Sequence, residues 1–195
     1  MITAYVSHAP KVSKAQIQAV LDGLKEAADE LGLDLKAWPV EQDEKEHATK
    51  LVAGEERIDA KTLAEHLNSE FNLRIHLTGK KVHVEDVESP WGHKSGQTLV
   101  CSIPAVEDAV GKENVLPALK KVGKHGLGEA LDSVPHGRYK TKTTAKGTHC
   151  EDEDCVMGDH MTTEDVGKKD YCGTCKERIL NHARDHIKHT REPLI

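Results

Sequence analysis

The sequence has few aromatic residues and no long apolar run. Its 195 residues include only two tryptophans, three tyrosines and one phenylalanine, so we expect a core of leucine, valine, isoleucine and alanine. No apolar run approaches the length of about 18 residues that a transmembrane helix needs, and we therefore expect no membrane span. The N-terminal segment lacks the basic and apolar regions of a secretory signal, which favours a cytoplasmic protein with reduced thiols.

The chain also lacks an excess of positive charge. Its formal net charge is −6 at pH 7, which argues against a protein whose main role is to bind nucleic-acid phosphates. Its content of 37% hydrophobic residues is too high for a chain that is disordered throughout. What the sequence does have is thirteen histidines and five cysteines, and its distinctive chemistry therefore lies in these two residue types.

The N-terminal part of the chain has the pattern of a strand, a helix and a second strand. The first strand is predicted over 2–6, and Ser13 begins a capping-box sequence ahead of a helical run of apolar residues. Gly32 is a natural end for that helix, and a second strand is predicted over 33–40. A strand–helix–strand unit of this kind favours two parallel, neighbouring strands.

The remaining elements also alternate between helices and strands. In order, we expect a loop or solvated helix over 41–57, a helix over 59–69, a hairpin of strands over 71–77 and 81–85, a loop over 86–96, a strand over 97–105, a helix over 114–132, a loop over 133–149 and a helix over 175–189. This order predicts the α/β (α+β) class, with a mixed twisted sheet, flanking helices and a small cysteine-rich part at the end.

The last four cysteines have the spacing of a metal site. They are Cys150, Cys155, Cys172 and Cys175, which form a C-x4-C pair and a C-x2-C pair. Two close pairs joined by a medium-length loop can surround one tetrahedral ion, and zinc suits four sulfur ligands best. An iron–sulfur centre is the competing occupant, and ordinary thiols or disulfides are the alternative without metal. A zinc site with four cysteines has no open position, so we expect a structural role, whereas Cys101 lies in an apolar strand as a buried small side chain.

A second group of candidate residues lies on the helix predicted over 114–132. This helix contains Gly123, Gly126 and Gly128, each of which costs about 1 kcal/mol relative to alanine. Glycines at this density indicate close packing against another backbone, or a site that needs room. His125 and Glu129 are four residues apart, so both project from one face of the helix, where they can share a metal ion or form a surface pair.

These two motifs together resemble those of the archaemetzincins, small zinc-dependent peptidases of the metzincin group. In that family a helix carries H-E-L-G-H-x-L-G, a third histidine precedes C-x4-C-x-M, and a C-x2-C pair follows. This chain reads HGLGEALD from His125, then His149-Cys150, Cys155-Val156-Met157 and the closing cysteine pair. The resemblance implies one metzincin-like domain over 1–195, containing a cysteine-rich zinc-binding segment over 149–190.

The resemblance also implies roles for individual residues. His125 matches the first zinc ligand, His149 the third, and Met157 the methionine of the Met-turn beneath the metal. Glu129 occupies the position of the second histidine, where its carboxylate could still bind metal. The four cysteines match a structural zinc site, so one structural zinc and a possible second zinc are expected.

Four departures from the family pattern alter the expected activity. Gly126 stands where the family has its catalytic glutamate, Glu129 replaces the second histidine, Asp132 replaces the glycine that ends the motif, and 133–148 is an insertion. A general base typically contributes about 10²–10⁴-fold to the rate, so we expect weak or absent peptidase activity. A carboxylate from 151–154 or Asp159 could take the place of the missing base.

Other histidines and a basic stretch have both a functional and an unremarkable interpretation. His136 and His160 are reserve ligand candidates or solvated side chains. The histidines of the last helix could bind a divalent metal or form a hydrated face, and the basic residues of the insertion could bind an anion or an acidic partner. These residues are His182, His186 and His189 of the helix, and Arg138, Lys140, Lys142 and Lys146 of the insertion.

The sequence thus leaves three functions open. The first is a zinc-binding metallopeptidase homologue with lost or altered activity towards a peptide or protein. The second is a non-enzymatic, zinc-stabilised binding module that recognises a protein or peptide partner, with nucleic acid disfavoured by the net acidity and by the absence of stacking aromatics near the cysteines. The third is a metal buffer or sensor that uses the thirteen histidines. The sequence does not indicate an oligomeric state.

Overall fold

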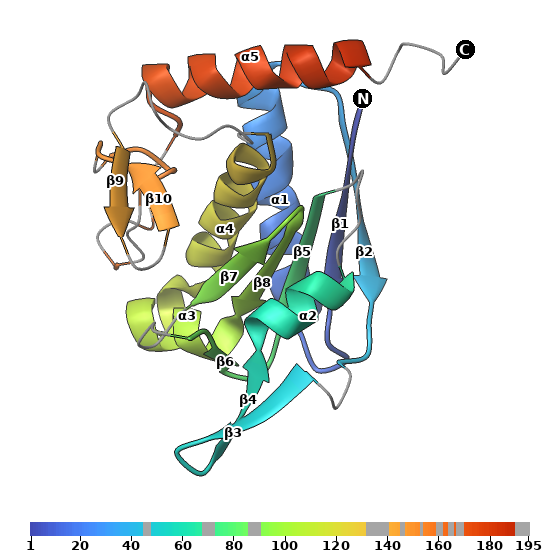
Figure 1. Cartoon of the computed structure of the whole chain (residues 1–195), viewed down its shortest axis with the longest axis vertical. Helices are drawn as coiled ribbons and strands as arrows, with labels where there is room; N and C mark the ends of the chain where they lie inside the picture. Colours follow the sequence, from blue (N-terminus) through green and yellow to red (C-terminus); the bar gives the residue numbers. More distant parts are fainter. Residues whose placement is uncertain are drawn as a thin grey trace.

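A computed structural model of the chain shows a central sheet between two layers of helices, with a cysteine-rich part at one end (Figure 1). For 141–144, 147–149 and 184–189 the description is of the backbone alone. The residues that the structure describes are 1–44, 48–67, 73–85, 91–131, 141–144, 147–152, 154–158, 162–163, 166 and 170–189.

The predicted strand–helix–strand unit at the N-terminus is confirmed. Strand β1 (Ile2–His8) pairs in parallel with β2 (Leu35–Glu41), and helix α1 (Lys14–Leu31) connects them. The side chain of Ser13 caps the N-terminus of α1 in a capping box with Gln16. Gly32 ends the helix in the left-handed conformation, with φ of 64°, which costs glycine little because it has no Cβ.

The central sheet has the strand order β2-β1-β5-β8-β7. Strands β5 (Leu73–Thr78) and β8 (Thr98–Ser102) continue the parallel arrangement, and β7 (Gly92–Ser95) pairs antiparallel with β8 at the edge. The hairpin predicted over 71–85 is therefore wrong, and the loop predicted over 86–96 is wrong for 92–95, which form β7, whereas 86–90 lie outside the described residues. Strand β5 is buried almost throughout, as expected for a central parallel strand covered on both faces. Its partners, β1 and β8, are both distant from it in the sequence.

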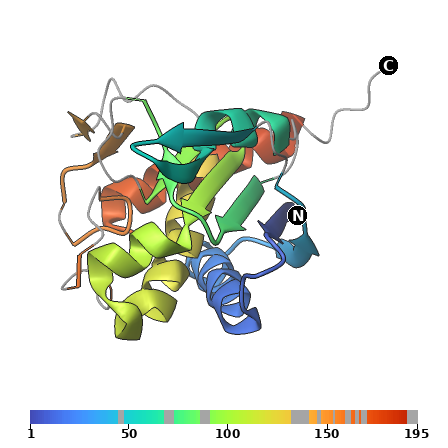
Figure 2. The same cartoon turned by 90° about the horizontal axis from the view of Figure 1, so that it is seen from below.

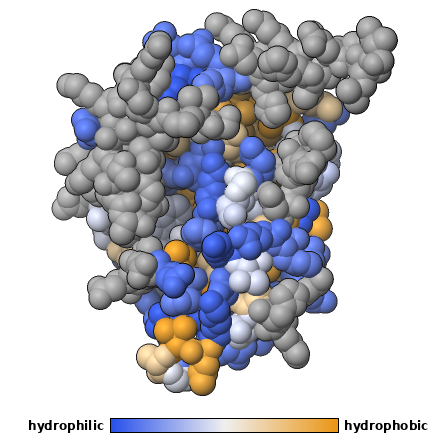
Figure 3. Space-filling model, viewed as in Figure 1, coloured by the Kyte–Doolittle hydropathy of each residue, from blue (hydrophilic) through white to orange (hydrophobic). Residues whose placement is uncertain are grey.

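A second, smaller sheet lies beside the first, and it corrects the interpretation of 41–57 as a loop or solvated helix. Strands β3 (Thr49–Val52) and β4 (Glu55–Asp59) form a hairpin, and β6 (Val82–His83) adds to β4. The hairpin extends from the body of the molecule and places a hydrophobic patch at the lower tip of the space-filling view, where Leu51 of β3 is 77% exposed (Figures 1 and 3). Helix α2 (Ala60–Leu67) follows β4, as predicted.

The helices cover the two faces of the central sheet. Helix α4 (Val115–Leu131), predicted over 114–132, packs with α1 on one face, and α2 contacts β7 and β8 on the other (Figure 2). The predicted strand over 97–105 is too long, because the Ser102 side chain caps a further helix, α3 (Ile103–Val110). A short 3₁₀ turn (Lys112–Asn114) links α3 to α4.

The C-terminal part forms a small hairpin and a long helix at one end of the molecule. Strands β9 (Thr141–Thr144) and β10 (Gly147–Cys150) pair antiparallel within a stretch predicted to be a loop. Helix α5 (Gly173–His189) agrees with the predicted final helix and runs across the end of α1 and α4 (Figure 1). None of the helices in the described part of the chain combines the length and apolar character needed to cross a bilayer.

The contact between α1 and α4 depends on two facing glycines. A Cβ atom at Gly123 would overlap the carbonyl oxygen of Val20 and lie 3.0 Å from the backbone nitrogen of Leu24, and a Cβ atom at Gly23 would overlap the carbonyl of Lys120. These neighbours are backbone atoms, which cannot rotate away. The expectation that the glycines of α4 allow a close approach of another backbone is thus confirmed at Gly123.

The Gly123→Ala substitution is therefore expected to destabilise the protein. Alanine alone would stabilise a helix by about 1 kcal/mol relative to glycine, but the added methyl group forces α1 and α4 apart, and we expect a net loss of about 3 kcal/mol. Urea denaturation measures the change. Gly79→Ala is the control, because no heavy atom lies within 4 Å of its added Cβ. Equal stability of Gly123→Ala and the wild type would contradict this account of the helix contact.

Candidate metal sites

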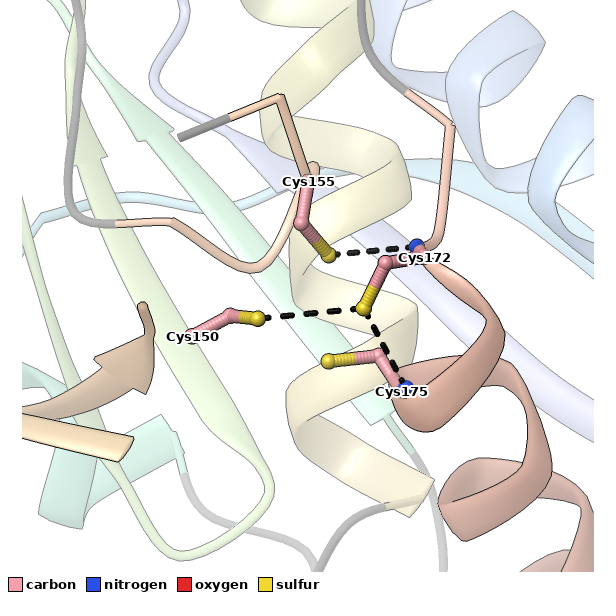
Figure 4. A group of neighbouring side chains, drawn as sticks. All are labelled: Cys150, Cys155, Cys172 and Cys175. Atoms are coloured by element: carbon pink, nitrogen blue, oxygen red, sulfur yellow. Dashed lines mark hydrogen bonds between the residues drawn. The ribbon is translucent and has the colours of Figure 1, made fainter. Parts of the chain in front are cut away.

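The structure brings together the four cysteines that the sequence singles out. Their sulfur atoms all lie within 4.8 Å of one another. Cys150 ends β10, Cys155 lies in a turn, and Cys172 and Cys175 lie at the start of α5, so three separate segments meet at this point (Figure 4). Cys155 and Cys175 are buried, whereas Cys150 and Cys172 are partly exposed.

The spacing of the four sulfurs fits a tetrahedral zinc ion. Zinc–sulfur bonds of about 2.3 Å place two sulfurs of a tetrahedron about 3.8 Å apart. The Cys150 and Cys172 Sγ atoms are separated by 3.8 Å. Backbone N–H groups also point at the sulfurs, from Cys172 to Cys155 Sγ at 3.3 Å and from Cys175 to Cys172 Sγ at 3.5 Å. Such N–H···S contacts stabilise thiolates, which are the form that binds metal.

The crowding of these thiols shifts their acidity in opposite directions. Hydrogen bonds from the Cys175 thiol and from the backbone N–H of Cys172 lower the pKa of Cys155 to about 5. The same contact with Cys155, together with burial, raises the pKa of Cys175, and burial raises the pKa of Cys150 to about 11. These opposite shifts favour negative charge on Cys155 first, because further negative charge at this spacing would be repelled.

The second predicted site is centred on His125, which is buried on α4. Its Nδ1 atom lies 2.8 Å from the carbonyl oxygen of Val156, in the turn that contains Cys155. Because a carbonyl can only accept, Nδ1 carries a proton and donates it, which leaves Nε2 as the ring atom for a ligand. The ring of Trp91 contacts the imidazole edge to face, with 6.0 Å between the ring centroids.

Glu129 faces the Nε2 side of this imidazole ring. The Glu129 Oε1 atom lies 3.5 Å from His125 Nε2. Two zinc ligands with bonds of about 2.1 Å are about 3.4 Å apart in a tetrahedron, so this pair has the separation of two ligands of one ion. Burial lowers the pKa of His125, but the charge of Glu129 and the Val156 carbonyl outweigh burial and raise that pKa above its ordinary value. This raised pKa favours a proton on the imidazole, so a metal ion at the pair would have to displace that proton.

The position of the family's catalytic glutamate faces the central sheet. A Cβ atom at Gly126 would lie 2.8 Å from Ile75 Cδ1 and 3.4 Å from a methyl carbon of Leu99. A larger side chain at this position would therefore need Ile75 to move. Gly128, in contrast, faces the C-terminal segment, where a Cβ atom would overlap Met157 Sδ and lie 2.9 Å from Tyr171 Cε1. Met157, predicted as the Met-turn methionine, is buried against α4 at this point.

Several residues near these sites were not predicted from the sequence. Lys94 of β7 donates from Nζ to the backbone carbonyl of Glu129 at 2.7 Å, which ties the edge strand to the end of α4. Tyr171 donates from its hydroxyl to the carbonyl of Lys124 at 2.5 Å, and Lys124 pairs with Asp170. Trp91 and Lys94 fall in the stretch predicted to be a loop. Their contacts with α4 depend on the pairing of β7 with β8, which the sequence does not reveal.

A serine, a histidine and a glutamate also meet in the core, although no sequence motif marks them. Ser7 Oγ lies 3.0 Å from His76 Nδ1, and His76 Nε2 lies 3.4 Å from Glu44 Oε1. This order of groups resembles that of a serine hydrolase, but Ser7 is 1% exposed and His76 is 0% exposed. No substrate can reach a serine buried to this degree, so the group serves to satisfy buried polar atoms between β1 and β5.

The remaining predicted residues receive no structural test. The side chain of His149 is outside the description, although its backbone lies in β10 and pairs with Lys142 of β9. The side chains of Lys142, His186 and His189 are also outside it. His182 is described on α5, and it has interaction partners of its own. Outside the described residues lie Asp132, His136, Arg138, Lys140, Lys146, Asp159 and His160.

Comparison with solved structures identifies the fold. Residue for residue, the chain is 19% identical to an archaemetzincin from Methanopyrus kandleri, with a TM-score of 0.69, over 94% of this chain and 96% of the other. A zinc-dependent peptidase from Methanocorpusculum labreanum is 12% identical, with a TM-score of 0.62 over 90% and 99% of the two chains. An archaemetzincin from Archaeoglobus fulgidus, in complex with malonate, is 14% identical, with a TM-score of 0.57 over 91% and 99%.

The chain therefore has the fold of the archaemetzincins, which confirms the predicted resemblance and the predicted fold class. No family model and no curated protein sequence matches the chain. The likeness is thus carried by the three-dimensional structure, and at these identities it establishes the fold. The group of four cysteines is a candidate metal site within that fold.

The Cys172→Ser substitution tests the cysteine site. A serine oxygen is a poor replacement for a thiolate, so we expect the loss of one zinc per chain and of about 4 kcal/mol of stability, or about 10 °C in Tm. Elemental analysis of untagged protein and thermal unfolding measure the two effects. Cys101→Ala is the control, because Cys101 is buried away from the other cysteines and should change stability but not the zinc content. An unchanged zinc content in Cys172→Ser would exclude the cysteine site.

Proposed function

We propose that the protein is a zinc-binding homologue of the archaemetzincin peptidases in which peptide hydrolysis is lost or strongly reduced. The observation that supports this proposal is the pairing of His125 Nε2 with Glu129 Oε1 at 3.5 Å on α4, beside a base position that is occupied by glycine. His125, Glu129 and His149 would hold the second zinc, and Cys150, Cys155, Cys172 and Cys175 would hold the first.

A zinc ion held by His125, Glu129 and His149 would supply Lewis-acid chemistry at this position. The other groups near this position hold and orient His125 and the end of α4. The Val156 carbonyl keeps the proton of His125 on Nδ1, and Lys94 holds the end of α4 against the edge strand. No side chain at position 126 can accept a proton from the attacking water, and this missing base is the reason that we expect slow hydrolysis or none.

The edge strand supports a peptide or protein as the ligand. Among the described residues, β7 pairs only with β8, and so its other edge has backbone groups available for a further strand. An extended peptide can bind such an edge through main-chain hydrogen bonds. Trp91 and Lys94 place this edge beside His125 and Glu129, so a peptide added here would pass the candidate metal site.

The alternative function, a non-enzymatic and zinc-stabilised binding module, draws on the same edge strand. It differs from the first function in needing no metal at His125. The packing of Gly126 against Ile75 favours this alternative, because a catalytic base at position 126 would require the core to shift. The metal content of the protein distinguishes the two functions.

The His125→Ala variant tests the second metal site. If the first function is correct, untagged wild-type protein contains two zinc ions per chain, and His125→Ala contains one, because the variant removes a ligand without touching the cysteines. Elemental analysis gives the count. His83→Ala, on the distant strand β6, is the control and should keep both ions. A single zinc ion in the wild type would instead favour the binding module.

A glutamate at position 126 tests the explanation for reduced activity. We expect Gly126→Glu, combined with Ile75→Val to remove the Cδ1 atom in its way, to raise zinc-dependent peptide hydrolysis by about 10²-fold over the wild type. The measurement is cleavage of a fluorogenic peptide library. Gly126→Gln with Ile75→Val is the matched control, since glutamine has the same size but cannot act as a base. Equal rates for the two variants would contradict the missing-base explanation.

A further inference from the structure

The turn that contains Cys155 links the cysteine site to the candidate second site. Cys155 is one of the four clustered cysteines, and the next residue, Val156, accepts the hydrogen bond from His125 Nδ1 at 2.8 Å. The residue after that, Met157, packs against Gly128 of α4. One short segment therefore contributes a sulfur to one site and the orienting carbonyl to the other.

The position of this turn depends on the same segments that carry the other cysteines. The backbone N–H of Val156 donates to the carbonyl of Asp170 at 3.0 Å, and that of Cys150 donates to the carbonyl of Met157 at 3.0 Å. Asp170 lies two residues before Cys172, and Cys150 is itself one of the clustered cysteines. An ion shared by the four sulfurs would hold these segments in one arrangement, whereas four thiols alone are joined by weak sulfur contacts.

We propose that the four-cysteine site positions the imidazole of His125 through the backbone of residues 155–157, so that filling it with metal raises the metal affinity of the His125–Glu129 pair. The inference rests on the proposed function, since it takes the pair to be a metal site. Hydrogen bonds from ligand histidines to fixed carbonyls typically contribute about 10–100-fold to metal affinity. By linkage, metal at His125 and Glu129 raises the affinity of the cysteine site by the same factor.

The substitution Gly128→Ala disturbs this connection without removing any ligand. Its Cβ atom would overlap Met157 Sδ and lie 2.9 Å from Tyr171 Cε1, so the side chain of Met157, which belongs to the turn, and the ring of Tyr171 must move, and the packing of the turn against α4 is disturbed. Gly126→Ala is the matched control on the same helix. Its Cβ atom would meet the flexible end of Ile75 on the opposite side, at 2.8 Å, and leave the turn in place.

The first measurement is the affinity for Co²⁺ of protein whose cysteine site is loaded with zinc, followed through the visible absorption of the cobalt. We expect Gly128→Ala to bind Co²⁺ at the second site about 10–100-fold more weakly than the wild type, and Gly126→Ala to bind it within about twofold. Equal affinity of Gly128→Ala and the wild type would overturn the proposal and leave the proposed function intact.

The second measurement separates the two claims when no second metal binds. In protein with ¹⁵N-labelled histidine, the Nδ1–H signal of His125, assigned with His125→Gln, reports the bond to Val156. We expect this signal to shift when zinc in the cysteine site is replaced by the larger Cd²⁺. This measurement does not use Gly128→Ala and therefore does not depend on whether that variant folds. If the signal shifts but no metal binds at His125, the positioning of His125 by the cysteine site is sustained and the proposed function is refuted. An unchanged signal refutes the positioning.

Discussion

The close approach of other segments to α4 is the constraint on which the rest of the structure depends. Gly123 admits the backbone of α1, Gly126 admits the side chain of Ile75 from the sheet, and Gly128 admits Met157 from the C-terminal turn. Three layers thus meet within six residues of one helix, and His125 lies among them. Because interiors are close-packed, a methyl group at any of these positions must displace a neighbour. The cost of glycine in a helix is offset by the contacts it allows.

The cysteine cluster explains how a polar C-terminal part can be joined to this helix. The sequence between α4 and α5 offers few apolar side chains, and among its described residues Val156, Met157 and Tyr171 are buried and lie within two residues of a clustered cysteine in the chain. An ion held by four sulfurs contributes folding free energy that such a segment cannot obtain from a core of its own. The turn that contains Cys155 also supplies the carbonyl that accepts the hydrogen bond from His125, so the cysteine cluster and the surroundings of His125 share a single piece of backbone.

Local elements could be predicted from the sequence, and long-range pairings could not. The capping box at Ser13, the left-handed Gly32 and the helices around α1, α2, α4 and α5 follow from side chains close together in the chain. The hairpin predicted over 71–85 is wrong because alternating polarity does not reveal which strand is the partner, and β5 pairs instead with β1 and β8. The buried contact between Ser7 and His76 was missed for the same reason.

The spacing of residues in the sequence predicts the two groups of candidate ligands. The spacing of the four cysteines predicts one tetrahedral cluster, since two close pairs can meet around a single ion, and the four-residue interval puts His125 and Glu129 on one face of a helix. Which other residues surround these groups depends on the tertiary structure. It turned Gly126 towards Ile75, placed Lys94 and the open edge of β7 beside Glu129, and brought the Val156 carbonyl to His125. Those contacts join residues that are far apart in the chain, and strand register and helix packing bring them together.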